Sequence, residues 1–128
     1  MDLASEKYVA LTTYRRNGDG LSNPMWIATD GDRLVMVTNA DSAKVKRLRN
    51  DPRVRLVRSD ARGRAADDAT LFEATAELLD DAGTAAARRA INAKYGLQAR
   101  LIEVWGGLAH LVLRRDEPRV GISITLDT

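Results

Sequence analysis

The stretch of sequence that decides the fold runs Thr38-Asn39-Ala40-Asp41-Ser42-Ala43-Lys44-Val45-Lys46-Arg47-Leu48-Arg49. Residues 34–38, which lead into this stretch, predict a buried strand, and the basic residues within it predict a short helix. Asp41 or Ser42 can cap this helix, because a short side-chain oxygen accepts a hydrogen bond from the free N–H groups of a first helical turn.

The N-terminus of this predicted helix is chemically suited to hold a phosphate. Its first-turn amides and the positive end of the helix dipole favour an anion, and Lys44 lies close to that end. Val45 and Leu48 are spaced to face inward, which turns the charged side chains outward. A solvated amphipathic helix is the alternative interpretation of the same charge run, and the rest of the chain decides between them.

Composition places the chain among globular proteins. It has 128 residues, of which 45% are hydrophobic and 30% are charged, and this suits a single domain, residues 1–128, with a core of its own. No apolar run is long enough to span a bilayer, and the N-terminus carries acids in place of the apolar core of a signal peptide. We therefore expect a cytoplasmic protein without a membrane partner.

Residue counts exclude several kinds of chemistry. Cysteine is absent, which removes disulfides, iron–sulfur clusters and thiol nucleophiles. His110 is the single histidine, and it falls in the apolar pattern of residues 108–113, which favours a packing role over a catalytic one. Asp30-Gly31-Asp32 and Asp80-Asp81 are typical of a turn and a helix start, so we predict no metal site.

Alternating apolar residues predict an antiparallel meander in the first third of the chain. Residues 8–15, 21–29 and 33–39 are expected to form strands, because they are rich in β-branched and aromatic residues and are separated by tight Gly-containing turns. Pro24 has no N–H for the ladder, so it suggests an edge, a bulge or a strand start. Turns this short leave no room for crossover helices.

The rest of the chain adds strands around a helical excursion. The first helix of the excursion is expected to have Thr84 near its start and to end at Gly96, a residue type common just past helix ends. The predicted elements are strands 53–59 and 69–79, helices 82–95 and 97–105, and strands 108–115 and 119–126. Together, the elements predict a mainly β protein with helices added, arranged as an antiparallel barrel or sandwich.

The basic helix and the residues that follow it resemble a known family. The resemblance rests on Ser42-Ala43-Lys44-Val45-Lys46-Arg47-Leu48-Arg49-Asn50-Asp51-Pro52-Arg53-Val54, which looks like the signature of the pyridoxamine-5′-phosphate-oxidase-like split β-barrel proteins. It is closest to the short branch predicted to use the deazaflavin coenzyme F420. Further pieces fit in the same order: Tyr8-Val9-Ala10-Leu11-Thr12-Thr13, Pro24-Met25-Trp26, Ser59-Asp60-Ala61-Arg62-Gly63-Arg64 and Lys94-Tyr95-Gly96-Leu97.

The resemblance implies a fold, an assembly and a cofactor site. The fold is an antiparallel split β-barrel, and the assembly is a homodimer with a cofactor groove at the subunit interface. Lys44 would bind the cofactor phosphate together with the Ser42 hydroxyl and the Val45 N–H. The residues implied along or beside the ring are Val37, Thr38, Asn39, Pro24, Met25 and Trp26.

F420 carries an acidic oligoglutamate tail in addition to its phosphate. Lys46, Arg47 or Arg49, with the loop that holds Arg62 and Arg64, could attract this tail. Each exposed pair would contribute only roughly 0.2–1 kcal/mol, so we expect the tail to bind diffusely and in a salt-sensitive way. Met25 and Trp26 alternate along a strand, so one of them is expected to face the core.

The function predicted from the resemblance is that of an F420-dependent oxidoreductase. It would transfer a hydride between F420 and a small organic substrate that has an activated C=C, C=N or nitro group, and no catalytic side chain is identified. FMN in the same groove is one alternative, and a non-catalytic protein that binds F420, a flavin or a tetrapyrrole is another. Nucleic acid is disfavoured as a partner because the net charge is only +2.

Overall fold

The computed structural model describes residues 3–65, 67–102 and 118–127. A short 3-10 turn, η1, precedes the first strand, and two helices interrupt the strands. The elements are η1 (Leu3–Ser5), β1 (Tyr8–Tyr14), β2 (Gly20–Met25), β3 (Ala28–Asp30), β4 (Arg33–Asn39), α1 (Ala43–Asn50), β5 (Arg53–Ser59), β6 (Leu71–Leu78), α2 (Asp81–Ile102) and β7 (Arg119–Leu126).

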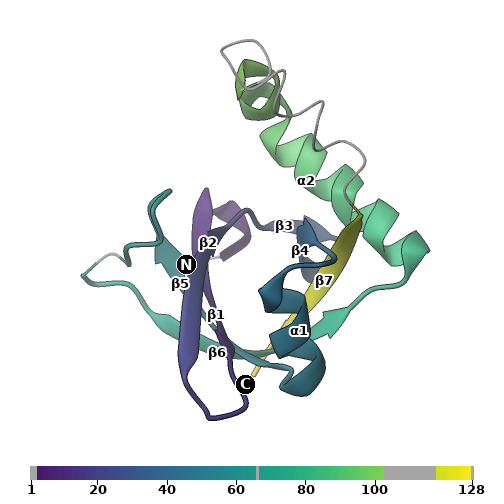
Figure 1. The fold of residues 1–128 in the computed structure, drawn as a ribbon. Helices are drawn as coiled ribbons and strands as arrows, with labels where there is room; N and C mark the ends of the chain where they lie inside the picture. Colours follow the sequence, from purple (N-terminus) through teal and green to yellow (C-terminus); the bar gives the residue numbers. More distant parts are fainter. Residues whose placement is uncertain (1–2, 66, 103–117, 128) are drawn as a thin grey trace.

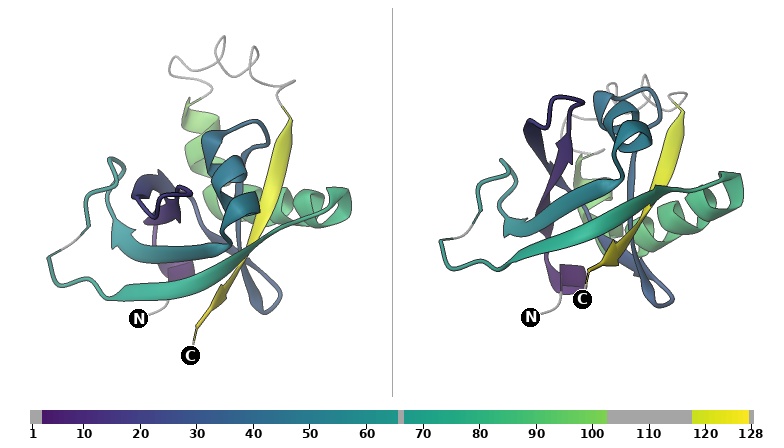
Figure 2. Two further views of the ribbon diagram at one scale, coloured as in Figure 1. Left: turned by 60° about the horizontal axis from the view of Figure 1, so that its bottom comes forward. Right: turned by 90° about the horizontal axis from the view of Figure 1, so that it is seen from below.

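The described strands form one curled antiparallel sheet of seven strands, in the order β2-β1-β5-β6-β7-β4-β3 (Figure 1, Figure 2). The two edge strands, β2 and β3, follow one another directly in the chain. The residues between them, Trp26 and Ile27, therefore link one edge of the sheet to the other. This arrangement is a split β-barrel, and it confirms the predicted mainly β fold with a basic helix after the meander.

The predicted strand over residues 21–29 is wrong in one respect, because the structure breaks it at Trp26 and Ile27. Its first part pairs with β1, with Val9 opposite Met25, and its second part pairs with β4. A single straight strand cannot pair with both edges of a curling sheet, so the chain bends between them. Pro24 lies in β2, an edge strand, as its missing N–H predicts.

Buried side chains form two clusters on opposite faces of the sheet. The barrel interior holds side chains such as Leu11, Met36 and Leu56, all fully buried. The second cluster lies beneath α2, where Val35 packs with Ile91 and Tyr95. Val35 and Met36 are neighbours in β4 and point to opposite faces, as the two-residue period of a strand requires.

The helical excursion differs from the predicted pair of helices. α2 runs unbroken through Gly96, which does not adopt a positive φ and so does not supply the left-handed turn that ends many helices. Asp80 fixes the first turn, since its Oδ1 accepts a hydrogen bond from the Gly83 N–H at 2.8 Å. Thr84 instead accepts from the Gly121 N–H at 2.9 Å, so it fastens α2 to β7.

Several predictions fall outside the part of the chain that the structure describes. They are the last residues of the helix expected over 97–105, the strand expected over 108–115, and the positions of Trp105 and His110. Among the described residues, no helix is long and apolar enough to cross a membrane.

Substitution by alanine should change the stability of the protein in opposite directions at two glycines, Gly121 in β7 and Gly96 in α2. A Cβ at Gly121 would lie 3.0 Å from the Thr84 Cα and 3.1 Å from the Ala87 Cβ, so Gly121→Ala should force α2 away from β7 and cost about 1–3 kcal/mol. A Cβ at Gly96 would meet nothing within 4 Å, so Gly96→Ala should stabilise the helix by about 0.5–1 kcal/mol. Urea denaturation checks both, and destabilisation by Gly96→Ala would contradict a continuous α2.

Candidate functional site

The start of α1 is built as the sequence predicts, with Ser42 as its N-cap. The Ser42 hydroxyl accepts a hydrogen bond from the Val45 N–H at 3.4 Å. The Asp41 N–H donates to the Asn39 side-chain oxygen at 2.8 Å, which shapes the turn between β4 and the helix. Val45 and Leu48 are buried at 0% and 5% exposure, so they fasten α1 to the barrel.

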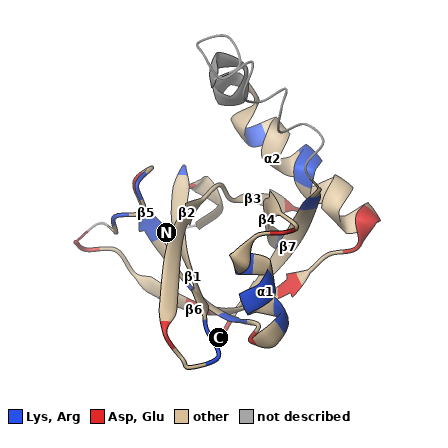
Figure 3. Cartoon of the chain, viewed as in Figure 1, with Lys and Arg blue, Asp and Glu red and all other residues tan. Residues whose placement is uncertain are grey.

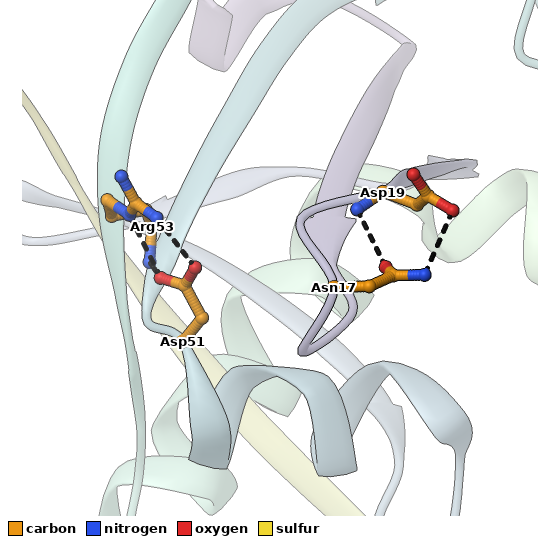
Figure 4. Close-up of polar contacts among 4 residues, drawn as sticks. All are labelled: Asn17, Asp19, Asp51 and Arg53. Carbon is orange, nitrogen blue, oxygen red and sulfur yellow. Dashed lines mark hydrogen bonds and ion pairs between the residues drawn. The ribbon is translucent and has the colours of Figure 1, made fainter.

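Local hydrogen bonds fix the two connections on either side of the α1–β1 contact (Figure 4). The Asp51 carboxylate, just after α1, accepts from the Arg53 backbone N–H and from its guanidinium at 3.0–3.1 Å. In the turn after β1, the Asn17 side-chain oxygen accepts from the Asp19 N–H at 3.0 Å. Both segments are therefore shaped by hydrogen bonds of their own.

Three cations, Lys44, Arg47 and Arg15, gather where α1 crosses the end of β1. The Arg47 Nε donates to the hydroxyl of Thr13 at 2.6 Å, and Thr13 is completely buried. Burial and the charge of Arg15 lower the pKa of Arg47. Burial, and secondly the charge of Arg47, lower the pKa of Lys44. We call these three residues the cation cluster.

The cation cluster has no acidic partner among the residues that the structure describes. The ion pairs among the described residues join other arginines to acids. They are Arg33 to Asp30, Arg53 to Asp51, Arg55 to Glu73 and Arg58 to Asp68. Partly buried cations that repel one another cost free energy unless an anion joins them. The arrangement is therefore chemically prepared for an anionic ligand.

The sequence pattern alone missed part of this cluster. Arg15 and Thr13 come from β1 and the turn after it, more than thirty residues before Arg47, and no periodicity ties the two segments together. Conversely, Lys46 and Arg49 are exposed on other sides of α1, so the basic run divides into a fixed part and a solvated part. Figure 3 shows how strongly basic residues dominate α1.

The residues predicted beside the ring fall into two groups. Trp26 and Val37 belong to the first group, since both side chains pack against the cluster beneath α2. Asn39 follows on the same strand face by alternation. This face leads along β4 directly to the N-terminus of α1.

Met25 and Thr38 belong to the other group. Met25 is 8% exposed and packs in the barrel interior, which confirms that Met25 and Trp26 point to opposite faces. Thr38 is 6% exposed. Both side chains are thus enclosed by protein, and any contact of these two positions with a cofactor would run through the backbone.

Pro24 lies against the loop that carries Arg62 and Arg64. A Cβ at Gly63 would lie 3.2 Å from the Pro24 Cδ, and Gly63 has a φ of 84°, which favours glycine. The Asp60 carboxylate accepts hydrogen bonds from the N–H groups of Arg62 and Arg64 at 2.8 and 2.9 Å. Residues 60–64 therefore form a turn that its own hydrogen bonds shape.

Comparison with known proteins places the chain in a family. Residues 2–128 match the family model described as pyridoxamine 5′-phosphate oxidase, so the chain belongs to that family. No curated protein matches the chain.

Solved structures share the fold at low sequence identity. A conserved hypothetical protein from Mycobacterium tuberculosis is 21% identical with a TM-score of 0.67, over 98% of this chain and 76% of that one. A protein described as an F420 reductase is 20% identical with a TM-score of 0.63, over 98% of this chain and 91% of that one. A heme storage protein from Vibrio cholerae is 11% identical with a TM-score of 0.60, over 97% and 84%.

The electrostatic coupling inside the cation cluster can be measured directly. In Arg47→Met, the pKa of Lys44 should rise part of the way back to 10.5, because the charge of Arg47 is the second cause of its lowering and burial the first. NMR titration of protein with ¹³C-labelled lysine side chains measures this value. Arg49→Met is the matched control, since Arg49 is exposed. An equal shift of the Lys44 pKa in both variants, or none in either, would contradict the cluster.

Proposed function

We propose that the protein is an F420-dependent oxidoreductase that acts on a small organic substrate with an activated C=C, C=N or nitro group. The observation that carries the proposal is the cation cluster at the start of α1, which lacks an acidic partner among the described residues. Membership of the pyridoxamine 5′-phosphate oxidase family and the shared fold of an F420 reductase support it.

The cation cluster fits the phosphate of the cofactor. The Lys44 ammonium is a compact donor, and the Arg47 guanidinium, already held through Nε by Thr13, keeps its other N–H groups for a second partner. A charge-assisted hydrogen bond of this kind contributes roughly 1.5–3 kcal/mol. A bound phosphate also offsets the repulsion among the three cations. Ser42 caps the N-terminus of α1 beside these cations.

The ring is proposed to lie along the outer face of β4. Trp26 and Val37 offer an apolar surface there, and Asn39 continues it toward Lys44. When bound, F420 supplies the hydride. The side chains of the protein hold the ring in one orientation and keep water from its face.

We propose that a second copy of this chain completes the cofactor groove as a homodimer. The described residues of a single chain supply one wall, the β4 face with Trp26, and this type of reaction needs a site closed to water.

The acidic tail of F420 is proposed to lie across the exposed cations. Lys46 and Arg49 on α1 and the pair Arg62 and Arg64 make no ion pair with a described residue. Salt should weaken this part of the binding more than the phosphate part, since exposed charges are screened and partly buried ones much less.

No described side chain stands out as an acid or base for product protonation. The Tyr95 hydroxyl is engaged by the backbone of Lys7 and Ile27, and burial raises its pKa, which keeps it neutral and occupied. Tyr8 and Tyr14 are only partly buried. The proton is therefore proposed to come from water or from one of these two tyrosines.

Two alternatives use the same site. FMN also carries a phosphate, so the cation cluster suits it equally, but FMN has no acidic tail for Arg49, Arg62 or Arg64. A non-catalytic binding protein is the other alternative, and the fold shared with a heme storage protein favours it. In that case, the protein would bind F420, a flavin or a tetrapyrrole without turnover.

Fluorescence titration with purified F420 and with FMN tests the proposal. The wild-type protein should show saturable binding of F420 at micromolar concentration. Lys44→Met should weaken F420 and FMN alike, by about tenfold or more, because both lose a charge-assisted hydrogen bond to the phosphate.

Arg49→Met serves as the control that separates the two cofactors. It should weaken F420 modestly, with a smaller dependence on salt than the wild type shows, and leave FMN unchanged, since only F420 carries the tail. Absence of saturable F420 binding to the wild type would contradict the proposed function. An equal effect of Arg49→Met on both cofactors would contradict the assignment of the tail.

A further inference from the structure

Two neighbouring residues of α2, Lys94 and Tyr95, hold the bend that joins the two edges of the sheet. The Lys94 ammonium donates to the backbone carbonyls of Ala4, Glu6 and Ile27, each at 2.6 Å. The N-terminal segment and the bend are thereby tied to the same point of α2.

The Tyr95 hydroxyl forms hydrogen bonds to the same bend, beside those of Lys94. It accepts a hydrogen bond from the Ile27 N–H at 3.1 Å, and it lies within donating distance of the carbonyls of Ile27 at 3.0 Å and Lys7 at 2.8 Å. Tyr95 is 4% exposed, so these bonds are sheltered from water. The Lys94 Nζ lies 4.9 Å from the centroid of the Tyr95 ring, which adds a cation–π contact.

The bend needs partners of this kind. Ile27 is completely buried and lies between β2 and β3, outside both ladders. A buried backbone N–H or C=O without a hydrogen bond is costly. α2 supplies both partners for Ile27, and so it fixes the peptide that directly follows Trp26.

The Tyr95 ring also fixes the plane of the Trp26 indole. The two rings are stacked, with centroids 4.4 Å apart and planes only 3° from parallel. Trp26 therefore has its backbone held through Ile27 and its ring held by Tyr95. Val37, on the strand that leads to Lys44, packs against the same cluster as Trp26.

We propose that Lys94 and Tyr95 are positioning residues that set the orientation of Trp26 for binding of the cofactor ring. The inference rests on the proposed function, in which Trp26 flanks the ring. It assigns a role in the site to a helix that contributes none of the predicted cofactor contacts. Because the ring of the ligand meets a Trp26 that is already oriented, less ordering remains to oppose binding.

Substitutions at Tyr95 can separate positioning from stability. A Trp105→Phe background leaves Trp26 as the single tryptophan. In that background, Tyr95→Leu removes the stacked ring, and Tyr95→Phe keeps the ring while removing the hydroxyl. Lys94→Met removes the ammonium. Val54→Ala is the matched control, because Val54 is 2% exposed in the barrel core and belongs to the other cluster, so its loss lowers stability without touching Trp26.

Three measurements are made on each variant: the melting temperature, the near-ultraviolet circular dichroism of Trp26 and the affinity for F420. Tyr95→Leu should change the Trp26 band and weaken F420 by about two- to tenfold, the worth of one aromatic stack. Tyr95→Phe should retain most of the band and of the affinity. Lys94→Met should lower affinity through the bend, and Val54→Ala should lower the melting temperature alone.

Positioning is overturned if Tyr95→Leu weakens F420 no more than Val54→Ala at a similar loss of stability, or if it leaves the Trp26 band unchanged. Failure of the proposed function has a different signature: the wild-type protein would show no saturable binding of F420. In that case the proposed role of Tyr95 in cofactor binding would also be wrong. The circular dichroism band of Trp26 would still show whether Tyr95 orients the indole.

Discussion

Closure of the sheet at one bend is the constraint on which the rest of the structure depends. β2 and β3 are the two edges of the curled sheet and are separated only by Trp26 and Ile27. A bend there leaves backbone groups that the ladders cannot satisfy, and Lys94 and Tyr95 of α2 supply their partners. Because α2 also packs on β7 at Gly121, the same helix braces the bend against β7, two strands in from the β3 edge.

Closure of the barrel also brings the cation cluster together. The buried side chains of Val45 and Leu48 fasten α1 to the barrel, and the Arg47 side chain bonds to the buried hydroxyl of Thr13 in β1. Partial burial of Lys44 and Arg47 beside Arg15 is unfavourable by itself, as the lowered pKa values of the first two show. An anion bound beside these cations would offset their mutual repulsion.

Much of the fold follows from the sequence because its signals are local. The alternation in residues 71–78 gives Ala74 and Ala76 their buried positions, and α1 ends at Asn50, just before Asp51-Pro52, since proline disfavours helix in the residue before it. The strand break at Trp26 and the continuity of α2 through Gly96 were missed. Both depend on what the segment packs against: the bend needs two sheet edges, and a helix interior tolerates a glycine at a cost of only about 0.5–1 kcal/mol.

The candidate site divides in the same way. Lys44, Ser42 and the face of Val37 could be predicted from the sequence, since one strand and the helix after it carry them. Arg15, Thr13, Lys94 and Tyr95 lie in other segments, and only the folded chain shows their contacts with Arg47, Ile27 and Trp26. The basic run of α1 looks uniform as sequence, yet Arg47 is fixed by a buried hydroxyl and Arg49 is exposed.

The crystal structure of the protein with bound F420 tests the role of the cation cluster most directly. The phosphate should lie within hydrogen-bond distance, roughly 2.7–3.2 Å, of both the Lys44 Nζ and the Arg47 guanidinium, with the Arg47–Thr13 bond retained. A phosphate held elsewhere, for example by Arg62 and Arg64, with Lys44 left free, would contradict the account.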